Sequence, residues 1–218
     1  MENKKIAFVS DFDGTISDDD FFAYTTKAYF DERALVPWRA FLGGKKTHFN
    51  ALKEMFAQIH VPIDELNALI DAIRLDPELE PTWKICRDKD IALYICSAGN
   101  DYYIRRLIGT LMKKYDVTLV SNHGEYVPET GLVMTAPEKT SPYFDEDVGI
   151  SKLKLVEKLK ADGFKVVFAG DGPPDIAPAQ VADVVFAKKF LLEACREKEI
   201  KTEPFENFKD ILIFFAGV

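Results

Sequence analysis

Short apolar runs alternate with longer amphipathic segments along most of this chain. The apolar runs are rich in β-branched residues and lie at residues 6–10, 91–97, 117–122, 165–170 and 183–187. Continuously apolar runs of this length are typical of strands that are covered on both faces. The stretches at residues 101–115, 151–162 and 188–199 have the length and polarity of helices. This alternation predicts an α/β fold in which a Rossmann-like parallel sheet is flanked by helices on both faces.

Residues 21–81 break the alternation. They contain no convincing strand, and "FNALKEMFAQI" and "IDELNALIDAI" have helical periodicity between a Gly-Gly pair and prolines. We therefore predict a small helical cap over residues 21–81, inserted after the first strand of the sheet. Residues 1–20 and 82–218 would form the α/β core domain.

Two further segments complete the prediction of local structure. Residues 124–136 are typical of a hairpin, with its turn at Glu129, Thr130 and Gly131. The C-terminal sequence "ILIFFAGV" is too short to span a bilayer, so we expect it to be a buried terminal segment.

Composition and charge exclude some classes of function. The 218 residues are 47% hydrophobic and carry a net charge of -8, which argues against a broad nucleic-acid surface. The sequence shows neither a signal peptide nor a membrane span. Its three scattered cysteines are typical of reduced thiols, so we expect a cytoplasmic protein without a disulfide framework.

Polar side chains follow the apolar runs at the points where the strands should end. Asp11 and Asp13 come directly after the first run, Ser97 ends the second, and Asp171 and Asp175 follow the fourth. Each of these alone is also typical of an acidic turn or a helix cap. Because the carboxyl ends of parallel strands meet at one edge of a sheet, their occurrence in order favours a single site there.

The residue types at this edge indicate phosphate chemistry with a metal ion. Oxygens from Asp11 and Asp171 suit a hard cation such as Mg²⁺, which would offset the repulsion between them. A carboxylate beside a phosphate is a plausible nucleophile, and Asp13 has the position of a proton donor to the leaving group. Lys152, which opens the helix at 151–162, is suited to hold phosphate oxygens together with Ser97.

The segments "DFDGT", "SAG", "GISK" and "GDGPPD" resemble, in order, the four motifs of the haloacid dehalogenase superfamily. The match spans nearly the whole chain, and the Asp-x-Asp form of the first motif is that of the superfamily's phosphatases. The chain is similar to the phosphoserine phosphatase branch, which carries a small helical cap. The likeness is closer still to the hydroxy-keto-methylthiopentenyl phosphate phosphatases of methionine salvage.

The resemblance implies a role for each residue that matches a motif. Asp11 would be the nucleophile and Asp13 the general acid and base. Lys152 would take part in catalysis and would bind phosphate together with Thr15, Ser97 and Ala98. Magnesium would be held by Asp11, the carbonyl of Asp13 and Asp171, with Asp175 in support.

The cap is expected to select the substrate. Asp20 occupies the position at which phosphoserine phosphatases have a glutamate for the ammonium group of the substrate, but it is equally suited to cap a helix. Phe21, Phe22, Tyr24 and Trp38 would line an apolar pocket or form a small core of the cap itself. The histidines show no spacing typical of metal ligands, and His123 is expected to have a structural role near the edge of the site.

The sequence thus predicts a magnesium-dependent phosphatase that hydrolyses a small phosphorylated metabolite through an aspartyl-phosphate. A phosphotransferase of the same superfamily is the alternative within enzymology. A phospho-accepting receiver-like domain is the alternative from another class, although receivers lack the helical insertion and the second aspartate. The sequence does not define the oligomeric state or the identity of the metabolite.

Overall fold

The computed structural model describes residues 5–218. It contains a seven-stranded sheet with the order β4-β3-β2-β1-β7-β8-β9. Neighbouring strands are parallel except for the antiparallel pair of β3 with β4. The strands of this sheet are β1 (Ile6–Ser10), β2 (Ala92–Asn100), β3 (Thr118–Val127), β4 (Gly131–Thr135), β7 (Lys165–Gly170), β8 (Val184–Ala187) and β9 (Glu203–Pro204). The predicted mostly parallel α/β sheet is therefore confirmed.

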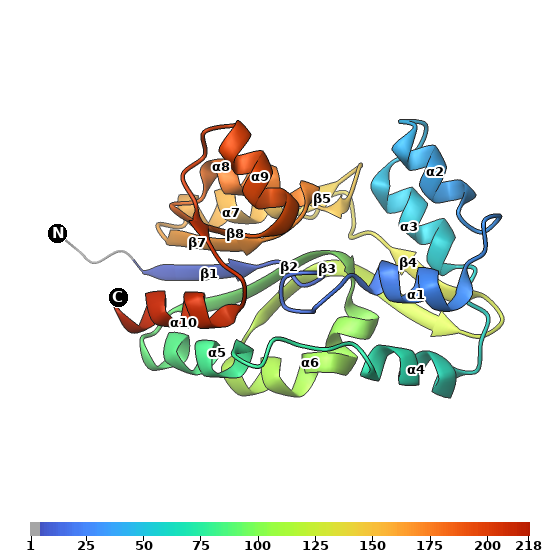
Figure 1. Cartoon of the computed structure of the whole chain (residues 1–218), viewed down its shortest axis with the longest axis horizontal. Coiled ribbons are helices and arrows are strands. Elements are labelled where there is room, and N and C mark those ends of the chain that lie inside the picture. Colours follow the sequence, from blue (N-terminus) through green and yellow to red (C-terminus); the bar gives the residue numbers. More distant parts are fainter. Residues whose placement is uncertain (1–4) are drawn as a thin grey trace.

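Helices cover both faces of the sheet (Figure 1). On one side lie α7 (Lys152–Ala161), α8 (Ile176–Val181) and α9 (Lys189–Glu197); on the other lie α5 (Leu79–Asp88), α6 (Asp101–Tyr115) and α10 (Phe208–Ala216). Successive residues of a strand face opposite sides. In β1, Ala7 and Val9 pack in the cluster beneath α7 and α9, whereas Phe8 packs against Phe208 and Phe215 of α10. This burial on both faces explains why the strand is apolar without interruption.

Two local predictions are confirmed. The hairpin joins β3 to β4, and Val127 pairs with Gly131 at its turn. The C-terminal segment forms α10, which buries Phe208, Ile211 and Phe215 while Ile213 remains exposed. A separate small ribbon, β5 (Phe144–Asp145) with β6 (Gly149–Ile150), precedes α7.

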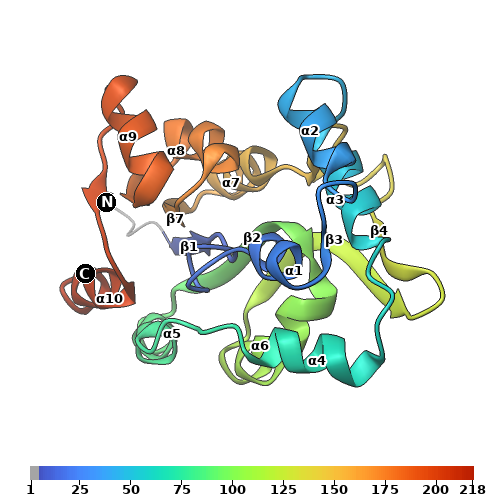
Figure 2. The same cartoon turned by 45° about the vertical axis from the view of Figure 1, so that its right-hand side comes forward.

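The segment after β1 is helical, as the sequence predicts. It forms α1 (Phe21–Tyr29), α2 (Val36–Leu42), α3 (His48–Phe56) and α4 (Ile63–Asp71). In both views α2 and α3 stand to the right of α7, whereas α4 lies near α6 (Figures 1 and 2). Buried side chains of α1, α3 and α4 join the same apolar cluster as those of α5, α6 and α10. The division into a cap at 21–81 and a core at 1–20 and 82–218 stays a prediction.

The parallel strands bring their carboxyl ends to one edge of the sheet. Ser10 pairs with Ile95 of β2 and with Ala169 of β7, so the residues that follow these strands start from neighbouring positions. The register of β2 with β3 shifts between Ser97 and Asn100, where the backbone leaves the regular ladder. Among residues 5–218, no helix has both the length and the apolar character that a bilayer crossing requires.

Candidate active site

Asp11 lies at the tip of β1 and is almost fully buried. Its backbone N–H still donates to the carbonyl of Ala169 on β7, so the ladder fixes its position. Its Oδ1 accepts the N–H of Phe12 at 2.7 Å and lies 2.8 Å from the ammonium of Lys152. Burial raises the pKa of the Asp11 carboxyl well above its usual range, and the charge of Asp175 raises it further, while Lys152 opposes both.

Lys152 is the cation at the centre of the site. It is the first residue of α7, whose N-cap Ser151 accepts the N–H of Lys154, so the helix start fixes where the side chain leaves the backbone. Its ammonium is buried between Asp11 and Asp175, at 2.8 and 2.5 Å. Burial alone would lower the pKa of Lys152, but the charges of Asp11 and Asp175 outweigh it and raise the pKa.

Asp175 contacts this ammonium, and both of its carboxylate oxygens accept hydrogen bonds from within the chain. Its Oδ1 receives Lys152, and its Oδ2 accepts the N–H groups of Asp171 and Gly172, each at 3.0 Å. It is fully buried. This arrangement suits a support that orients Lys152 and the loop of Asp171.

Asp171 follows β7 and faces the loop after β1. Its Oδ1 accepts the hydroxyl of Thr15 at 3.1 Å, and its Oδ2 lies 3.1 Å from the ammonium of Lys189. Gly14 has a φ of +71°, and a Cβ there would lie 2.3 Å from Oδ2, so only glycine allows this close approach. Because the Thr15 hydroxyl is bonded to Asp171 and its N–H to Phe12, its predicted contact with phosphate stays a prediction.

Asp13 receives donors on both of its oxygens. Oδ1 accepts the N–H of Phe21, the first residue of α1, at 3.0 Å. Oδ2 accepts the hydroxyls of Ser97, at 3.3 Å, and of Tyr103. Burial raises the pKa of Asp13, and the N–H of Phe21 opposes that effect. A carboxyl with a raised pKa that is fixed in orientation is suited to proton transfer.

The donor set fits a hard cation. Carboxylate oxygens of Asp11, Asp171 and Asp175 lie within 4.8 Å of one another, and all three residues are buried. Buried like charges repel one another unless a cation compensates them. Oxygen donors of this kind are those that Mg²⁺ prefers. Both oxygens of Asp175 are engaged by Lys152 and two amides, and Asp175 is fully buried, so Asp11 and Asp171 are the side chains better suited to bind a metal.

Asp20 lies at the N-cap position of α1, but its side chain accepts no hydrogen bond from the first turn of that helix. Asp20 is an exposed residue, and the pKa of its carboxyl is raised to about 7, first by desolvation and then by the charges of Asp13 and Asp171. Asp20 therefore lies close enough to these two residues of the site for their charges to act on it. Its predicted contact with the substrate stays a prediction.

The aromatic residues of the cap divide into two groups. Phe21 is buried and stacks on Tyr103 with ring centroids 4.3 Å apart, so it belongs to the core. Phe22, Trp38, Phe41 and His48 are only half-buried, and we call them the cap aromatic cluster. Its rings contact one another at centroid distances from 4.3 to 5.8 Å.

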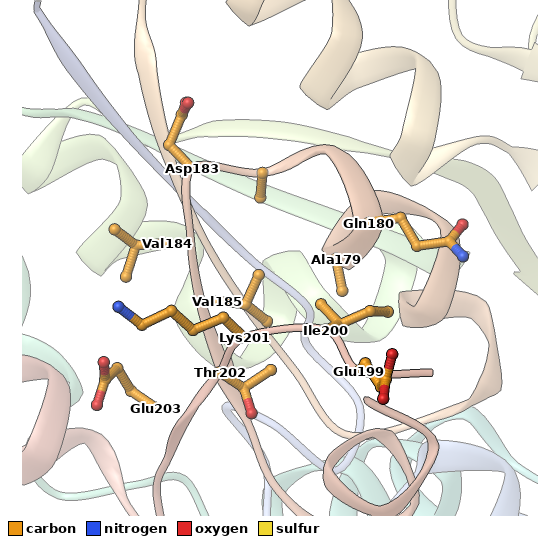
Figure 3. A pocket seen from close by; sticks show the side chains of 11 residues that line it. Ala179, Gln180, Asp183, Val184, Val185, Glu199, Ile200, Lys201, Thr202 and Glu203 are labelled. Atoms are coloured by element: carbon orange, nitrogen blue, oxygen red, sulfur yellow. The ribbon is translucent and has the colours of Figure 1, made fainter. Parts of the chain in front are cut away.

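Two hollows lie at different edges of the sheet. One of about 390 Å³ is lined by residues such as Gln180, Lys201 and Glu203, at the amino ends of β8 and β9 (Figure 3). Ligands of open α/β sheets bind at the opposite, carboxyl edge. The other, of about 650 Å³, lies at that edge beside Thr15 and Lys189 and is also lined by Arg74. The candidate site is thus next to the larger hollow.

Comparison with known proteins identifies the family. The sequence profile of the haloacid dehalogenase-like hydrolases matches residues 8–180. The chain belongs to this family. It is 28% identical to a polyol phosphate phosphatase of Saccharomyces cerevisiae, over 95% of this chain and 91% of that protein. It is also 28% identical to a 2-hydroxy-3-keto-5-methylthiopentenyl-1-phosphate phosphatase of Geobacillus thermodenitrificans, over 96% of this chain and 94% of that protein.

Solved structures agree with this assignment at the level of the fold. A substrate-bound phosphoserine phosphatase aligns with a TM-score of 0.70 at 20% identity, covering 98% of this chain and 99% of the other. The predicted resemblance and fold are therefore confirmed. So is the predicted enzyme class: this hydrolase is a phosphoric monoester hydrolase that acts on small phosphorylated substrates.

Three residues that contact the site were not predicted from the sequence. Tyr103 and the N–H of Phe21 bind Asp13, and Lys189 binds Asp171 and the carbonyl of Gly14. The sequence held a weak signal for Tyr103, because it lies in the first turns of the helix that follows a site strand. His123 lies at the surface, with its Nδ1 3.1 Å from Asp101, and no contact to the four carboxylates is seen in the described part of the chain.

Proposed function

We propose that this hydrolase is a magnesium-dependent phosphatase that works through an aspartyl-phosphate on Asp11. The observation that carries the proposal is the placement of Lys152, whose buried ammonium lies 2.8 Å from Asp11 and is anchored by Asp175. A lysine fixed in this way neutralises a phosphate that approaches Asp11, and its charge opposes the rise that burial causes in the pKa of the Asp11 carboxyl.

The chain's own residues divide the chemistry. A carboxylate oxygen of Asp11 attacks phosphorus, and the bond from phosphorus to the ester oxygen breaks. Asp13 gives its proton to that oxygen and later takes a proton from the water that hydrolyses the aspartyl-phosphate. The hydroxyl of Ser97 and the amide of Ala98, near the carboxyl end of β2, would contact phosphate oxygens.

Asp11, Asp171 and the carbonyl of Asp13 are the groups that would hold magnesium, with Asp175 in support. When bound there, the ion supplies positive charge for the phosphate oxygens. The buried carboxylates within 4.8 Å of one another support this role. Lys189 already places one cation on Asp171, which shows that this carboxylate accepts a positive neighbour.

We infer that the substrate is the phosphate ester of a short carbon chain that carries hydroxyl groups. The names of the two relatives share this chemistry, as a polyol phosphate and as a 2-hydroxy-1-phosphate. The carboxyl of Asp20, whose residue is exposed, is suited to accept hydrogen bonds from such hydroxyls. The cap aromatic cluster offers apolar surface to the carbon chain.

A panel of phosphate esters tests the proposal. Purified protein with Mg²⁺ is assayed for released phosphate on glycerol and sugar-alcohol phosphates, phosphoserine and nitrophenyl phosphate. We expect repeated turnover, with higher kcat/KM for the hydroxylated alkyl esters than for phosphoserine. Phosphate uptake that stops at one equivalent would instead indicate a receiver-like domain. Transfer to an added alcohol in place of water would indicate a phosphotransferase.

A further inference from the structure

Tyr103 is a buried hydroxyl group at the site for which the proposed function gives no role. It lies on α6, one turn from the end of β2, and is 1% exposed. Its hydroxyl donates to Oδ2 of Asp13, and burial followed by the charge of Asp13 raises its pKa well above the usual range.

The surroundings of Tyr103 are built to bring this hydroxyl to Asp13. The ring stacks on Phe21 with centroids 4.3 Å apart and contacts Phe12 at 5.8 Å. A Cβ at Gly99 would lie 1.9 Å from the Tyr103 hydroxyl and 3.0 Å from Oδ2 of Asp13. Glycine at this position thus leaves the space in which the two groups meet.

We propose that Tyr103 is a positioning residue that holds the carboxyl of Asp13 toward the leaving group. The inference rests on the proposed function, in which Asp13 is the general acid. The N–H of Phe21 at 3.0 Å fixes the other oxygen, so the carboxyl is held from both ends.

The step in which Tyr103 matters follows from the proton balance. Asp13 starts the step protonated and ends it as a carboxylate, because its proton moves to the ester oxygen as the phosphorus–oxygen bond breaks. A hydrogen bond from Tyr103 is stronger to the carboxylate than to the neutral acid. It therefore stabilises the product of proton transfer, and it does so most where the leaving group needs that proton.

Tyr103→Phe removes the hydroxyl and keeps the ring. We expect kcat/KM for an alkyl phosphate such as glycerol phosphate to fall about ten- to hundredfold, as for loss of a hydrogen bond to a charged group. Nitrophenolate leaves with little help from an acid, so kcat/KM for nitrophenyl phosphate should change by less than about threefold. The ratio of the two values is measured within one preparation, so it does not depend on the fraction of folded protein.

Tyr115→Phe is a matched control. It lies at the far end of the same helix, and its hydroxyl donates to the carboxylate of Glu80 at 3.0 Å. The ratio of alkyl to aryl kcat/KM should stay at the wild-type value in this variant. In an Asp13→Asn background, Tyr103→Phe should add no further change to the ratio, because the acid on which Tyr103 acts is already gone.

The outcomes separate this inference from the proposed function. If wild-type protein turns over both esters and Tyr103→Phe lowers kcat/KM equally for both, or for neither, Tyr103 has only a structural role and the inference is wrong. A further fall of the ratio in the Asp13→Asn background would also contradict it. If wild-type protein releases phosphate from neither ester, the proposed function fails and the inference fails with it.

Discussion

The polar groups at the carboxyl edge of the sheet and those in the cap aromatic cluster differ in their hydrogen-bond partners. At the sheet edge each of the four site carboxylates accepts at least two donors, and Lys152 is paired twice. In the cluster of Phe22, Trp38, Phe41 and His48, the imidazole Nδ1 of His48 is buried and has no hydrogen-bond partner within the described chain. The site carboxylates are fixed by the chain before any ligand arrives, whereas the imidazole Nδ1 of His48 is not fixed in this way.

This difference indicates a division of labour. A fixed arrangement of charges suits phosphate, which is the same group in every substrate. Half-buried rings and an unpaired imidazole suit the variable organic part of a substrate. Changes at the sheet edge should therefore affect all esters, and changes in the cap should affect some esters more than others.

The largest effect is expected from Asp11→Asn, which keeps the shape of the side chain but removes the nucleophile. Turnover of every ester should fall by several orders of magnitude while the protein stays folded. Asp88→Asn is the control. Asp88 forms an exposed ion pair with Lys84, and this variant should retain full activity. Acid quenching should trap phosphate on Asp11 in wild-type protein; finding it on Asp13 would reassign the nucleophile.

Removal of metal should abolish turnover equally for all esters, because it acts at the sheet edge. Activity should vanish with chelator and return with Mg²⁺. A second readout is the melting temperature, which Mg²⁺ should raise in wild-type protein and raise less in Asp171→Asn. Full turnover by protein whose measured metal content is nil would refute the metal site.

Asp13→Asn should distinguish leaving groups. We expect kcat/KM for alkyl phosphates to fall about a hundred- to ten-thousandfold, and kcat/KM for nitrophenyl phosphate to fall far less. The comparison uses kcat/KM because slow hydrolysis of the aspartyl-phosphate would limit kcat equally for both. Equal losses, with chemistry shown to limit the rate, would assign Asp13 to positioning of the metal.

Trp38→Ala should change selectivity more than it changes chemistry. We expect kcat/KM for the best alkyl ester to fall about ten- to hundredfold. Inhibition by inorganic phosphate, which contacts only the sheet edge, should stay within about twofold. Leu42→Ala, at an exposed position on the same helix, is the matched control. If Trp38→Ala weakens inhibition by phosphate as much as it lowers kcat/KM, the cap aromatic cluster and the sheet edge do not act independently.

The smallest effect concerns stability and pH. Burial, and then the charge of Lys152, lowers the pKa of His48 to about 4. Below pH 6.5 the unfolded chain binds a proton at this residue that the folded chain does not, so stability falls as the pH drops from 6.5 toward 4. Since the ring is half-buried, we expect this fall in the free energy of unfolding to be about 1–2 kcal/mol.

Denaturant unfolding at pH 7 and pH 4.5 measures this contribution of His48. His48→Phe should lose less stability between the two values than wild-type protein does. If wild type and variant differ in free energy of unfolding by the same amount at both pH values, the low pKa of His48 does not contribute to stability as expected.

Much of the site followed from the sequence because a parallel sheet imposes it. Strand β1 ends at Ser10 and β7 at Gly170, at the residues that the apolar runs predict. Asp11 and Asp171 must then meet, since both follow neighbouring strands in the same direction.

The elements that the sequence did not predict are those with little periodicity. Helix α8 has six residues and β9 has two, too few for an apolar pattern to show. The cap posed another difficulty, because its helices share one apolar cluster with the core and their pattern does not mark a boundary.

The sequence by itself thus determined where the strands end, which residue types follow these ends and the family to which the chain belongs. Only the tertiary structure decided which donor reaches which oxygen: that Tyr103 and Phe21 hold Asp13, that Asp175 anchors Lys152, and that Lys189 reaches Asp171. The physical reason is one of scale. The positions of strands and helices follow from burial patterns over many residues, whereas a hydrogen bond depends on the placement of two side chains to within a few tenths of an ångström.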